Sequence, residues 1–403
     1  MKYLILGAGP AGLAFANALL KAGQDNFVLL EANSEAGGLC RSEMVDGYPL
    51  DIGGGHFLDV KREEVNSFLF DFMPRDEWEL FERNSQIYVH DKYIGHPFEA
   101  NIWQFGTDEQ IKYLKSIAIA GCNLGEAKPT EFINWIYWKL GKDIADNYML
   151  PYNKKMFGQN LNDLGTYWME KLPNVSFEDT LRSCLEKKAY GQQPGHAKFY
   201  YPKKYGYGEL WLRMAAALGE RIEYNKRVVK LNAENLSVHT EDGAMYKADC
   251  LITTIPWTQF QEITGMPDDV LKSISKLKHT SVQVDYYPEN LNTMAQWIYY
   301  PDPKYTYHRI LVRHNFCAGK GYWTETNCDN LTDTACNARY TYVNEYAYPL
   351  NTIEKPAIMN ELLTWGKQRK IFGLGRWGEH QHYNSDVTVD FALKAAKRII
   401  SED

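Results

Sequence analysis

The N-terminal stretch "KYLILGAGPAGLAFANALLKAG", residues 2–23, decides the fold. Residues 2–6 form a short apolar run, and residues 11–23 have the apolar spacing of a helix. A second apolar run, "FVLLEAN", follows at residues 27–33. The pattern predicts a strand, a glycine turn, a helix and a second strand, the βαβ unit with which a doubly wound α/β domain begins.

The glycines of the turn have the spacing G-x-G-x-x-G, and each has a physical role. Gly7 permits a tight turn, Gly9 lets the backbone approach a pyrophosphate, and Gly12 lets the helix pack closely on the strand. The start of the helix offers free N–H groups and a positive dipole to phosphates. Glu31 ends the second strand 19 residues after Gly12 and can accept hydrogen bonds from a ribose. These residues predict a dinucleotide site.

Composition excludes several other classes of protein. The chain has 403 residues, 45% hydrophobic and 24% charged, which indicates a globular protein of two or more domains. A net charge of −7 argues against general nucleic-acid binding. The seven cysteines are odd in number and form no C-x-x-C, so we expect no disulfide framework, no metal site and a cytoplasmic location. Gly and Pro interrupt the apolar start, so we expect neither a signal peptide nor a membrane span.

Glycine-rich segments beyond the fingerprint point to FAD. "EANSEAGGLCRS" runs from Glu31 to a glycine pair and Arg41, and "YPLDIGGGHFL" brings three more glycines and His56. In outline these segments resemble the FAD proteins of the amine oxidase and protoporphyrinogen oxidase superfamily. The resemblance implies that the backbone passes close to a flat ring system, and that Val228, in "NKRVVKL", contacts the adenine through backbone groups.

A narrower resemblance covers nearly the whole chain. Six segments, in order, are similar to segments of the UDP-galactopyranose mutase family: "DIGGGHFL" (51–58), "IGHPFEANIW" (94–103), "LPYNKKMFG" (150–158), "YTYHRILV" (305–312), "YAYP" (346–349) and "GLGRWGEHQHYNSDVTVDFALKAA" (373–396). The resemblance implies a ring contraction that converts a nucleotide sugar from pyranose to furanose without net redox change. The nucleophile is N5 of the reduced flavin, and the nucleoside diphosphate is the leaving group.

The same resemblance assigns roles to single residues. His56, Arg309 and Arg376 form the expected catalytic set, with His56 beside the flavin and the arginines on the diphosphate. Arginine suits a departing diphosphate because its fork matches two phosphate oxygens. The expected cofactor residues are Gly7, Gly9, Pro10, Ala11, Gly12, Glu31, Gly38, Leu39, Arg41, Gly55, His56, Val228, Gly375, Arg376, Asp386 and Val387. The expected substrate residues are Phe157, Lys171, Tyr201, Arg309, Tyr346, Tyr348, Arg376 and His382, with Tyr348 preferred to Tyr346 as the diphosphate-binding tyrosine.

Three of these positions depart from the family's pattern. Phe157 stands where the family has tryptophan, Lys171 where it has arginine, and His382 where it has tyrosine, although Tyr383 follows. An ammonium carries charge but lacks the bidentate geometry of a guanidinium. All three changes fall in the substrate set, so the sugar need not be galactose.

Ordinary structural roles remain open for several candidates. His56 could be a satisfied histidine in a glycine loop, and Tyr201 could belong to a glycine-rich turn. Arg309 could pair with a neighbouring carboxylate, and Arg313 shares its strand face by period-two alternation. The rival function is a true oxidoreductase of the amine oxidase, desaturase or protoporphyrinogen oxidase type, which shares every FAD motif but has no reason to build an arginine site for a diphosphate.

We therefore expect a mixed α/β protein with a Rossmann-like FAD domain, a helical insertion and an antiparallel sheet domain. The expected bounds are 1–75, 206–265 and 365–403 for the FAD domain, 101–190 for the insertion, and 76–100, 191–205 and 266–364 for the sheet domain. The expected cofactor is FAD in its reduced form, and the expected partner is a nucleotide-diphosphate sugar. The resemblance leaves open whether NAD(P)H or a reductase reduces the flavin, and whether the chain forms a homodimer.

Overall fold

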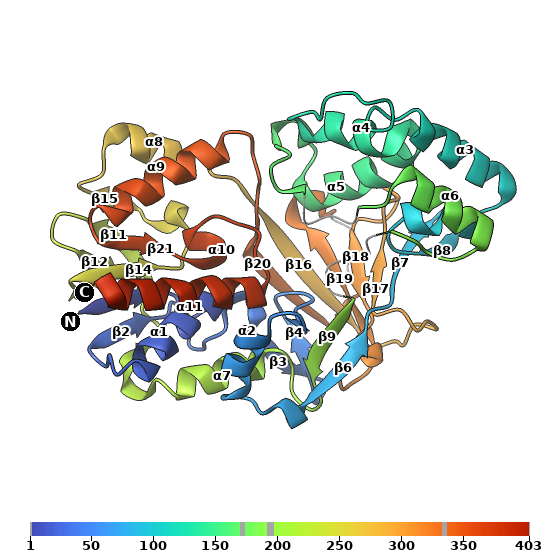
Figure 1. Cartoon of the computed structure of the whole chain (residues 1–403). Coiled ribbons are helices and arrows are strands. Elements are labelled where there is room, and N and C mark those ends of the chain that lie inside the picture. Colours follow the sequence, from blue (N-terminus) through green and yellow to red (C-terminus); the bar gives the residue numbers. More distant parts are fainter. Residues whose placement is uncertain (1, 170–173, 192–196, 333–336, 403) are drawn as a thin grey trace. The chain divides into compact units, whose positions relative to one another are not determined.

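The computed structural model describes residues 2–169, 174–191, 197–332 and 337–402. The chain divides into two compact units, each built from discontinuous segments (Figure 1). Unit 1 consists of Met1–Glu79, Tyr200–His279 and Glu354–Asp403. Unit 2 consists of Leu80–Phe199 and Thr280–Ile353.

A parallel five-stranded sheet is the centre of unit 1. Its strands lie in the order β10 (Ile222–Glu223), β2 (Phe27–Leu30), β1 (Tyr3–Leu6), β14 (Cys250–Thr253) and β21 (Ile371–Gly373). The first two strands of the chain and the helix between them, α1 (Pro10–Lys21), form the predicted βαβ unit. The predicted α/β class is thereby confirmed.

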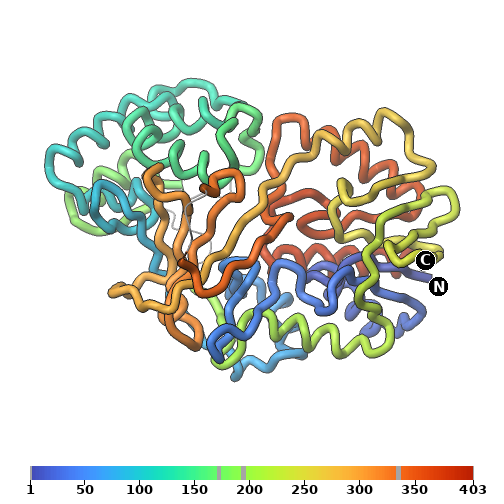
Figure 2. The backbone as a smooth tube through the Cα atoms, turned by 180° about the vertical axis from the view of Figure 1, so that it is seen from behind, coloured from blue at the N-terminus to red at the C-terminus, as the bar shows by residue number. Residues whose placement is uncertain are grey.

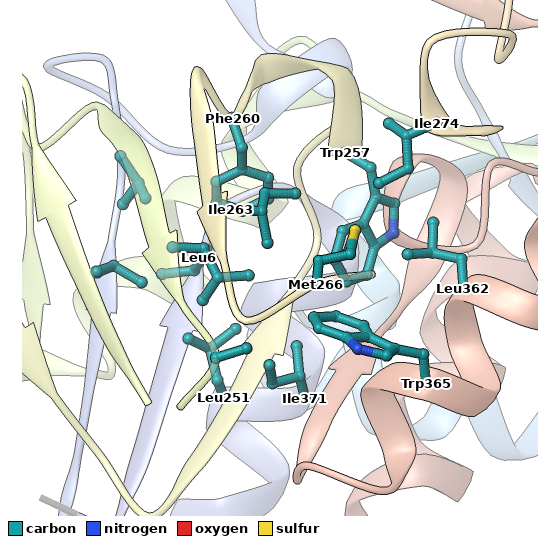
Figure 3. Packing of buried hydrophobic residues seen from close by; sticks show 14 of the residues in the cluster. Leu6, Leu251, Trp257, Phe260, Ile263, Met266, Ile274, Leu362, Trp365 and Ile371 are labelled. Atoms are coloured by element: carbon teal, nitrogen blue, oxygen red, sulfur yellow. The ribbon is translucent and has the colours of Figure 1, made fainter. Parts of the chain in front are cut away.

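The two faces of this sheet receive different layers, because successive side chains of a strand point to opposite sides. On β1, Ile5 lies under α1, next to Gly12. Leu4 and Leu6 point the other way, into a core cluster that also contains Leu251 and Ile371 (Figure 3). A second sheet supplies more of that cluster; its strands are β13 (Met245–Lys247), β12 (Ser237–Thr240), β11 (Val228–Asn232) and β15 (Glu262–Thr264).

Four segments that the sequence placed with the sheet domain lie in unit 1 instead: residues 76–79, 200–205, 266–279 and 354–364. The two longer ones, 266–279 and 354–364, contain α8 (Asp268–Ile274) and most of α9 (Lys355–Lys367). The cause is burial: Ile274 and Leu362 pack into the core cluster of unit 1 (Figure 3). Local periodicity shows that a helix has an apolar face, but not which core receives it.

The ends of the chain meet in unit 1. The last helix, α11 (Ser385–Glu402), packs along α1. Figure 2 shows the blue N-terminal and red C-terminal segments side by side. Residues 365–403 thus lie in the same unit as the start of the chain, the arrangement that the sequence predicts.

Unit 2 contains a seven-stranded sheet and a group of helices. The strands lie in the order β20 (Tyr340–Pro349), β16 (His279–Tyr287), β19 (Tyr322–Asn327), β18 (Arg309–Leu311), β17 (Trp297–Tyr299), β7 (Ser85–Val89) and β8 (Lys92–Gly95). The pairs β16–β19, β19–β18, β18–β17 and β7–β8 are antiparallel, whereas β17 and β7 are parallel. The helices are α3 (Thr107–Ala118), α4 (Phe132–Ile144), α5 (Leu150–Phe157) and α6 (Phe177–Glu186). They fall within the predicted insertion, 101–190, and belong to the same unit as the sheet.

Within the described ranges, no helix combines the length and the apolar character that crossing a membrane requires.

Candidate functional site

The turn between β1 and α1 in unit 1 brings backbone very close to backbone. Gly7 has φ +96°, a conformation that favours glycine, and its N–H donates to Leu30 O at 2.8 Å. A Cβ at Gly12 would lie 2.0 Å from Gly7 O, so only glycine allows α1 to pack this tightly on the strand. The structure thus brings the fingerprint glycines together as the sequence predicts.

The first turn of α1 is suited to an anion. Gly9 is the N-cap and Pro10 the first helical residue, and the first turn contains no acidic side chain. Among the residues placed by the structure, none caps this end through its side chain, and the N–H groups of Ala11 and Gly12 find no acceptor there. Free N–H groups and the positive end of a helix dipole together form a phosphate site.

Glu31 lies directly beyond β2 and is fixed beside this turn. The carboxylate is 5% exposed; its Oε2 accepts from Ala8 N at 2.8 Å. Its Oε1 accepts from both the backbone N and the side-chain Nδ2 of Asn33, at 2.9 and 2.8 Å. A carboxylate offers about four acceptor positions. Three are used within the protein, which leaves acceptor capacity for a ribose hydroxyl.

A second glycine segment approaches the first. Gly37 N donates to Ala8 O at 2.8 Å, and Gly38 has φ +54°. A Cβ at Gly38 would lie 3.2 Å from Gly9 Cα. Arg41 Nε donates to Gly38 O at 3.2 Å, so the arginine also braces this loop. The cradle is therefore made largely of main chain, which matches a ligand that presents phosphates and a flat ring.

The third glycine segment positions His56. A Cβ at Gly53 would lie 1.7 Å from Leu39 O, so this loop also touches the second segment through its backbone. His56 Nδ1 lies 3.0 Å from Gly54 O. Because a carbonyl can only accept, Nδ1 is the donor in this contact. The ring stacks on Tyr207 with centroids 6.3 Å apart.

Behind His56 lies a buried carboxylate that the sequence analysis did not assign. Asp51 is 1% exposed; Ser42 Oγ donates to its Oδ1 at 2.5 Å, and Tyr207 N donates to the same oxygen at 3.0 Å. Tyr201 OH donates to Oδ2 at 2.7 Å, and the tyrosine is fully buried. This contact gives Tyr201 the structural role that the sequence left open, within the core of unit 1.

The C-terminal segment adds the last part of unit 1. Gly375 has φ +73°, and a Cβ there would lie 2.5 Å from Ala11 Cβ, so the segment touches the start of α1. Arg376 donates through Nε and Nη2 to Tyr383 O at 3.1 and 2.8 Å. The guanidinium therefore holds the loop that contains His382, which is half-buried.

Asp386 lies in the first turn of α11 and is 2% exposed. Its Oδ2 accepts from Arg62 Nε at 2.9 Å, whereas its Oδ1 is buried with no hydrogen-bond partner in the described structure. A buried oxygen of this kind is costly unless a ligand or water supplies a donor.

The remaining predicted cofactor residues also lie in unit 1. Val228 begins β11 and pairs with Thr240 at a register shift, which interrupts the regular ladder. The half-buried ones are Pro10, Leu39, Gly55 and Val387. Together with the helix terminus and the orphan oxygen of Asp386, these residues fit FAD.

The predicted diphosphate residues lie on the sheet of unit 2. Arg309 on β18 faces Glu325 on β19 in the strand register. Glu325 Oε2 accepts from Arg309 Nε at 3.1 Å and from Nη2 by a shorter bond. Arg309 Nη2 also lies 3.3 Å from the hydroxyl of Tyr348. The structure thus brings the hydroxyl of Tyr348 to the arginine.

Glu325 is a site residue that the sequence analysis missed. It is 1% exposed; burial acts to raise the pKa of its carboxyl, but Arg309 and His308 together outweigh burial and lower that pKa to about 2. The available signal was a lone acid in "YWTETN", inside a strand of otherwise buried character. The competing arginine, Arg313, is fully buried, with its guanidinium 5.0 Å from the ring centroid of Tyr286.

Of two other substrate candidates, Phe157 and Lys171, the structure describes only Phe157. Phe157 ends α5 and is 8% exposed, with its ring edge-on to Trp168 at 5.8 Å. Lys171 lies outside the described residues. Across the described ranges, no group of three or more His, Cys, Asp or Glu could hold a metal ion.

The glycine cradle, the anion-binding helix terminus and the carboxylate after β2 define a dinucleotide-binding flavoprotein. Residues 10–284 match the model of the flavin containing amine oxidoreductase family, and the chain belongs to that family. Its cofactor is FAD.

Curated relatives match only short parts of the chain. Putrescine oxidase of Kocuria rosea is 27% identical over 128 residues, 32% of this chain and 26% of that protein. An uncharacterized protein in the nifH2 3′ region of Methanothermococcus thermolithotrophicus is 51% identical over 53 residues, 13% of this chain and 50% of that protein. The matches thus span less than two thirds of either relative.

Solved structures match over the full chain at low identity. A reduced UDP-galactopyranose mutase is similar with a TM-score of 0.87 and 22% identity, covering 100% of this chain and 94% of that one. A putative protoporphyrinogen oxidase from Exiguobacterium sp. 255-15 is similar with a TM-score of 0.73 and 13% identity, covering 100% of this chain and 99% of that one. A double mutant of putrescine oxidase has a TM-score of 0.65 and 15% identity, covering 99% of both chains. These likenesses establish the fold of an FAD-binding flavoenzyme.

Proposed function

We propose that the chain is an FAD-dependent nucleotide-sugar mutase that interconverts pyranose and furanose forms. The observation that carries the proposal is the state of Arg309. Its side chain is 15% exposed, two of its nitrogens are bonded to Glu325 and Tyr348, and in the described structure Nη1 makes no hydrogen bond. An arginine fixed in this way, with one donor left over, suits a phosphate oxygen. The likeness to a reduced UDP-galactopyranose mutase supports the same function.

Different residues of the chain would have different roles in such a reaction. FAD, when bound in its reduced form, supplies a nucleophilic flavin nitrogen to the anomeric carbon. Arg309 Nη1 and the Tyr348 hydroxyl donate to the diphosphate, whose negative charge grows as it leaves. Fixed donors of this kind stabilise the transition state more than the ground state. His56, which the third glycine segment positions, is proposed to lie beside the flavin.

The roles of the remaining candidates follow from their contacts. Arg376 acts by holding the loop of His382 through Tyr383 O, and it stays in the proposed catalytic set. Phe157 and His382 are proposed to shape the sugar site, so the preferred sugar can differ from galactose. Lys171 is proposed to add a cation, and Tyr346 stays second to Tyr348.

The membership in the amine oxidoreductase family and the partial match to putrescine oxidase favour a second candidate, an FAD-dependent oxidoreductase. The two candidates differ in what they do to the substrate. A mutase returns an isomer and consumes no oxygen, whereas an oxidase consumes oxygen and yields an oxidised product.

The test is an incubation of the dithionite-reduced protein with UDP-galactopyranose and a panel of other nucleotide sugars. Dithionite replaces the NAD(P)H or reductase that the proposal requires. We expect chromatography to show a furanose product in the reduced sample and none in the oxidised one. Oxygen consumption with an amine such as putrescine, without isomerisation of any nucleotide sugar, would contradict the mutase and favour the oxidoreductase.

A further inference from the structure

Glu325 holds Arg309 in an unusual way. Both donors, Nε and Nη2, are directed at the same oxygen, Oε2, of a carboxylate that is 1% exposed. The pair is fixed by the register of β18 and β19, in which Arg309 and Glu325 are direct neighbours. The Tyr348 hydroxyl accepts from Nη2 at 3.3 Å and restrains the guanidinium from another strand, β20.

We propose that Glu325 is a positioning residue, which fixes the Arg309 guanidinium so that Nη1 remains available to an oxygen of the diphosphate. The inference rests on the proposed mutase function and extends it to a residue that does not itself contact the substrate. Its physical basis is preorganisation: a donor that is already oriented needs no reorganisation when charge develops on the leaving group.

The charges around Glu325 support this role. His308 Nε2 lies 3.7 Å from Glu325 Oε2, and the imidazole is fully buried. Burial lowers the pKa of His308 although Glu325 acts in the opposite direction, so the imidazole is neutral near pH 7. Arg309 therefore supplies the charge that compensates the carboxylate. The pair carries no net charge, and Glu325 contributes direction rather than attraction for an anion.

Replacing the Glu325 carboxylate by an amide separates the orientation of Arg309 from its attraction for an anion. Glu325→Gln keeps the shape of the side chain and removes its charge, so the attraction of Arg309 for phosphate is no longer offset. We expect the affinity for UDP, measured by calorimetry on the holoenzyme, to stay the same or rise. We expect kcat with the best nucleotide sugar to fall roughly 100-fold, because the guanidinium is no longer fixed. A merely structural residue would not divide binding and turnover in this way.

Two further variants provide controls. Asp285→Asn makes the same exchange at another buried carboxylate of this sheet, bonded to Gln283 and Thr341, and should leave kcat unchanged. Glu325→Asp keeps the negative charge on a side chain that is one methylene shorter. This variant should bind UDP normally and have a kcat between those of Glu325→Gln and the wild type. It also provides the test if Glu325→Gln does not fold, which flavin absorbance and thermal unfolding will show.

The outcomes separate the inference from the function on which it rests. The inference is overturned if the active wild type has kcat equal to that of both folded Glu325 variants. It is also overturned if UDP binding and kcat fall together in them. A wild type that neither binds UDP nor forms a furanose overturns the proposed function, and the inference with it.

Discussion

The hydroxyl of Tyr201 donates to the buried Asp51 carboxylate at 2.7 Å, beneath the loop of His56. Tyr201→Phe should destabilise the protein by about 1.5–3 kcal/mol, because a buried charge loses a hydrogen bond and no water replaces it. Urea unfolding of the holoprotein measures the change in free energy of unfolding. The matched control is Tyr205→Phe at an exposed ring, expected within about 0.5 kcal/mol of the wild type. Equal effects of the two variants would contradict the structural role of Tyr201.

Arg309 cannot be tested cleanly by Arg309→Ala, because that change leaves Glu325 buried without its partner, at a cost of about 3–5 kcal/mol. Arg309→Lys keeps the positive charge. Its ammonium can remain with Glu325 but cannot reproduce the planar fork that leaves Nη1 free. We expect a roughly 100-fold lower kcat with unchanged flavin absorbance, measured by furanose formation.

The matched control for Arg309→Lys lies in unit 1. Arg213 also forms a bidentate pair, with Glu77, at 2.7 and 2.8 Å. Arg213→Lys should leave kcat unchanged. Full activity of Arg309→Lys would remove Arg309 from the proposed diphosphate site.

Single residues were predictable from the sequence where the reason for their presence is local. The fingerprint glycines and Glu31 act within one βαβ unit, so spacing alone identifies them. Glu325 acts through a neighbour on another strand, and Asp51 through a tyrosine 150 residues away. Such partners are set by sheet register and tertiary packing, which no short window of sequence contains.

At the scale of elements, the contact between β1 and α1 decides whether the cofactor cradle can form. In Gly12→Ala the new Cβ would lie 2.0 Å from Gly7 O, so the helix must move away from the strand. We expect the purified variant to lose most of its FAD, read as the ratio of flavin to protein absorbance. Gly106→Ala is the control, since a Cβ there would meet no atom closer than 3.9 Å. Normal FAD content in Gly12→Ala would contradict the proposed cradle.

The elements also show how far periodicity alone can predict a fold. The predicted strands at residues 2–6 and 27–33 correspond to β1 and β2, because buried parallel strands appear as continuous apolar runs. For α8 and α9 the same rules identify an apolar face without its destination. Their buried apolar residues, such as Ile274 and Leu362, enter the core of unit 1 only because the chain returns there.

At the scale of the whole molecule, each unit is built from segments that lie far apart in the sequence. The predicted FAD domain already included the start, middle and end of the chain, on the strength of motifs in all three. Unit 1 exceeds that prediction at the edges, by residues 76–79, 200–205, 266–279 and 354–364. Motifs mark the parts that hold the cofactor, whereas boundaries depend on which apolar surfaces cover one another.

The stability of the whole protein should depend on pH through Glu379, whose carboxylate accepts from Gly375 N at 3.0 Å. Burial raises the pKa of Glu379 from 4.5 to about 7, although the Gly375 N–H and Arg398 act in the opposite direction. The folded state therefore holds this proton more tightly than the unfolded state. The resulting stability is fully present below pH 4.5 and is lost as the pH rises to about 7, by about 3 kcal/mol.

Glu379→Gln removes this linkage, so its free energy of unfolding should be flatter between pH 4.5 and 7 than that of the wild type. Glu325 contributes the opposite slope in a lower window: its pKa of about 2 adds stability above pH 4.5 that disappears as the pH falls towards 2. Urea unfolding at half-unit pH steps separates the two, because their windows do not overlap. Glu361→Gln, at an exposed glutamate of α9, should leave the whole profile unchanged. If the wild type and Glu379→Gln have parallel profiles from pH 4.5 to 7, Glu379 does not hold its proton in the folded protein.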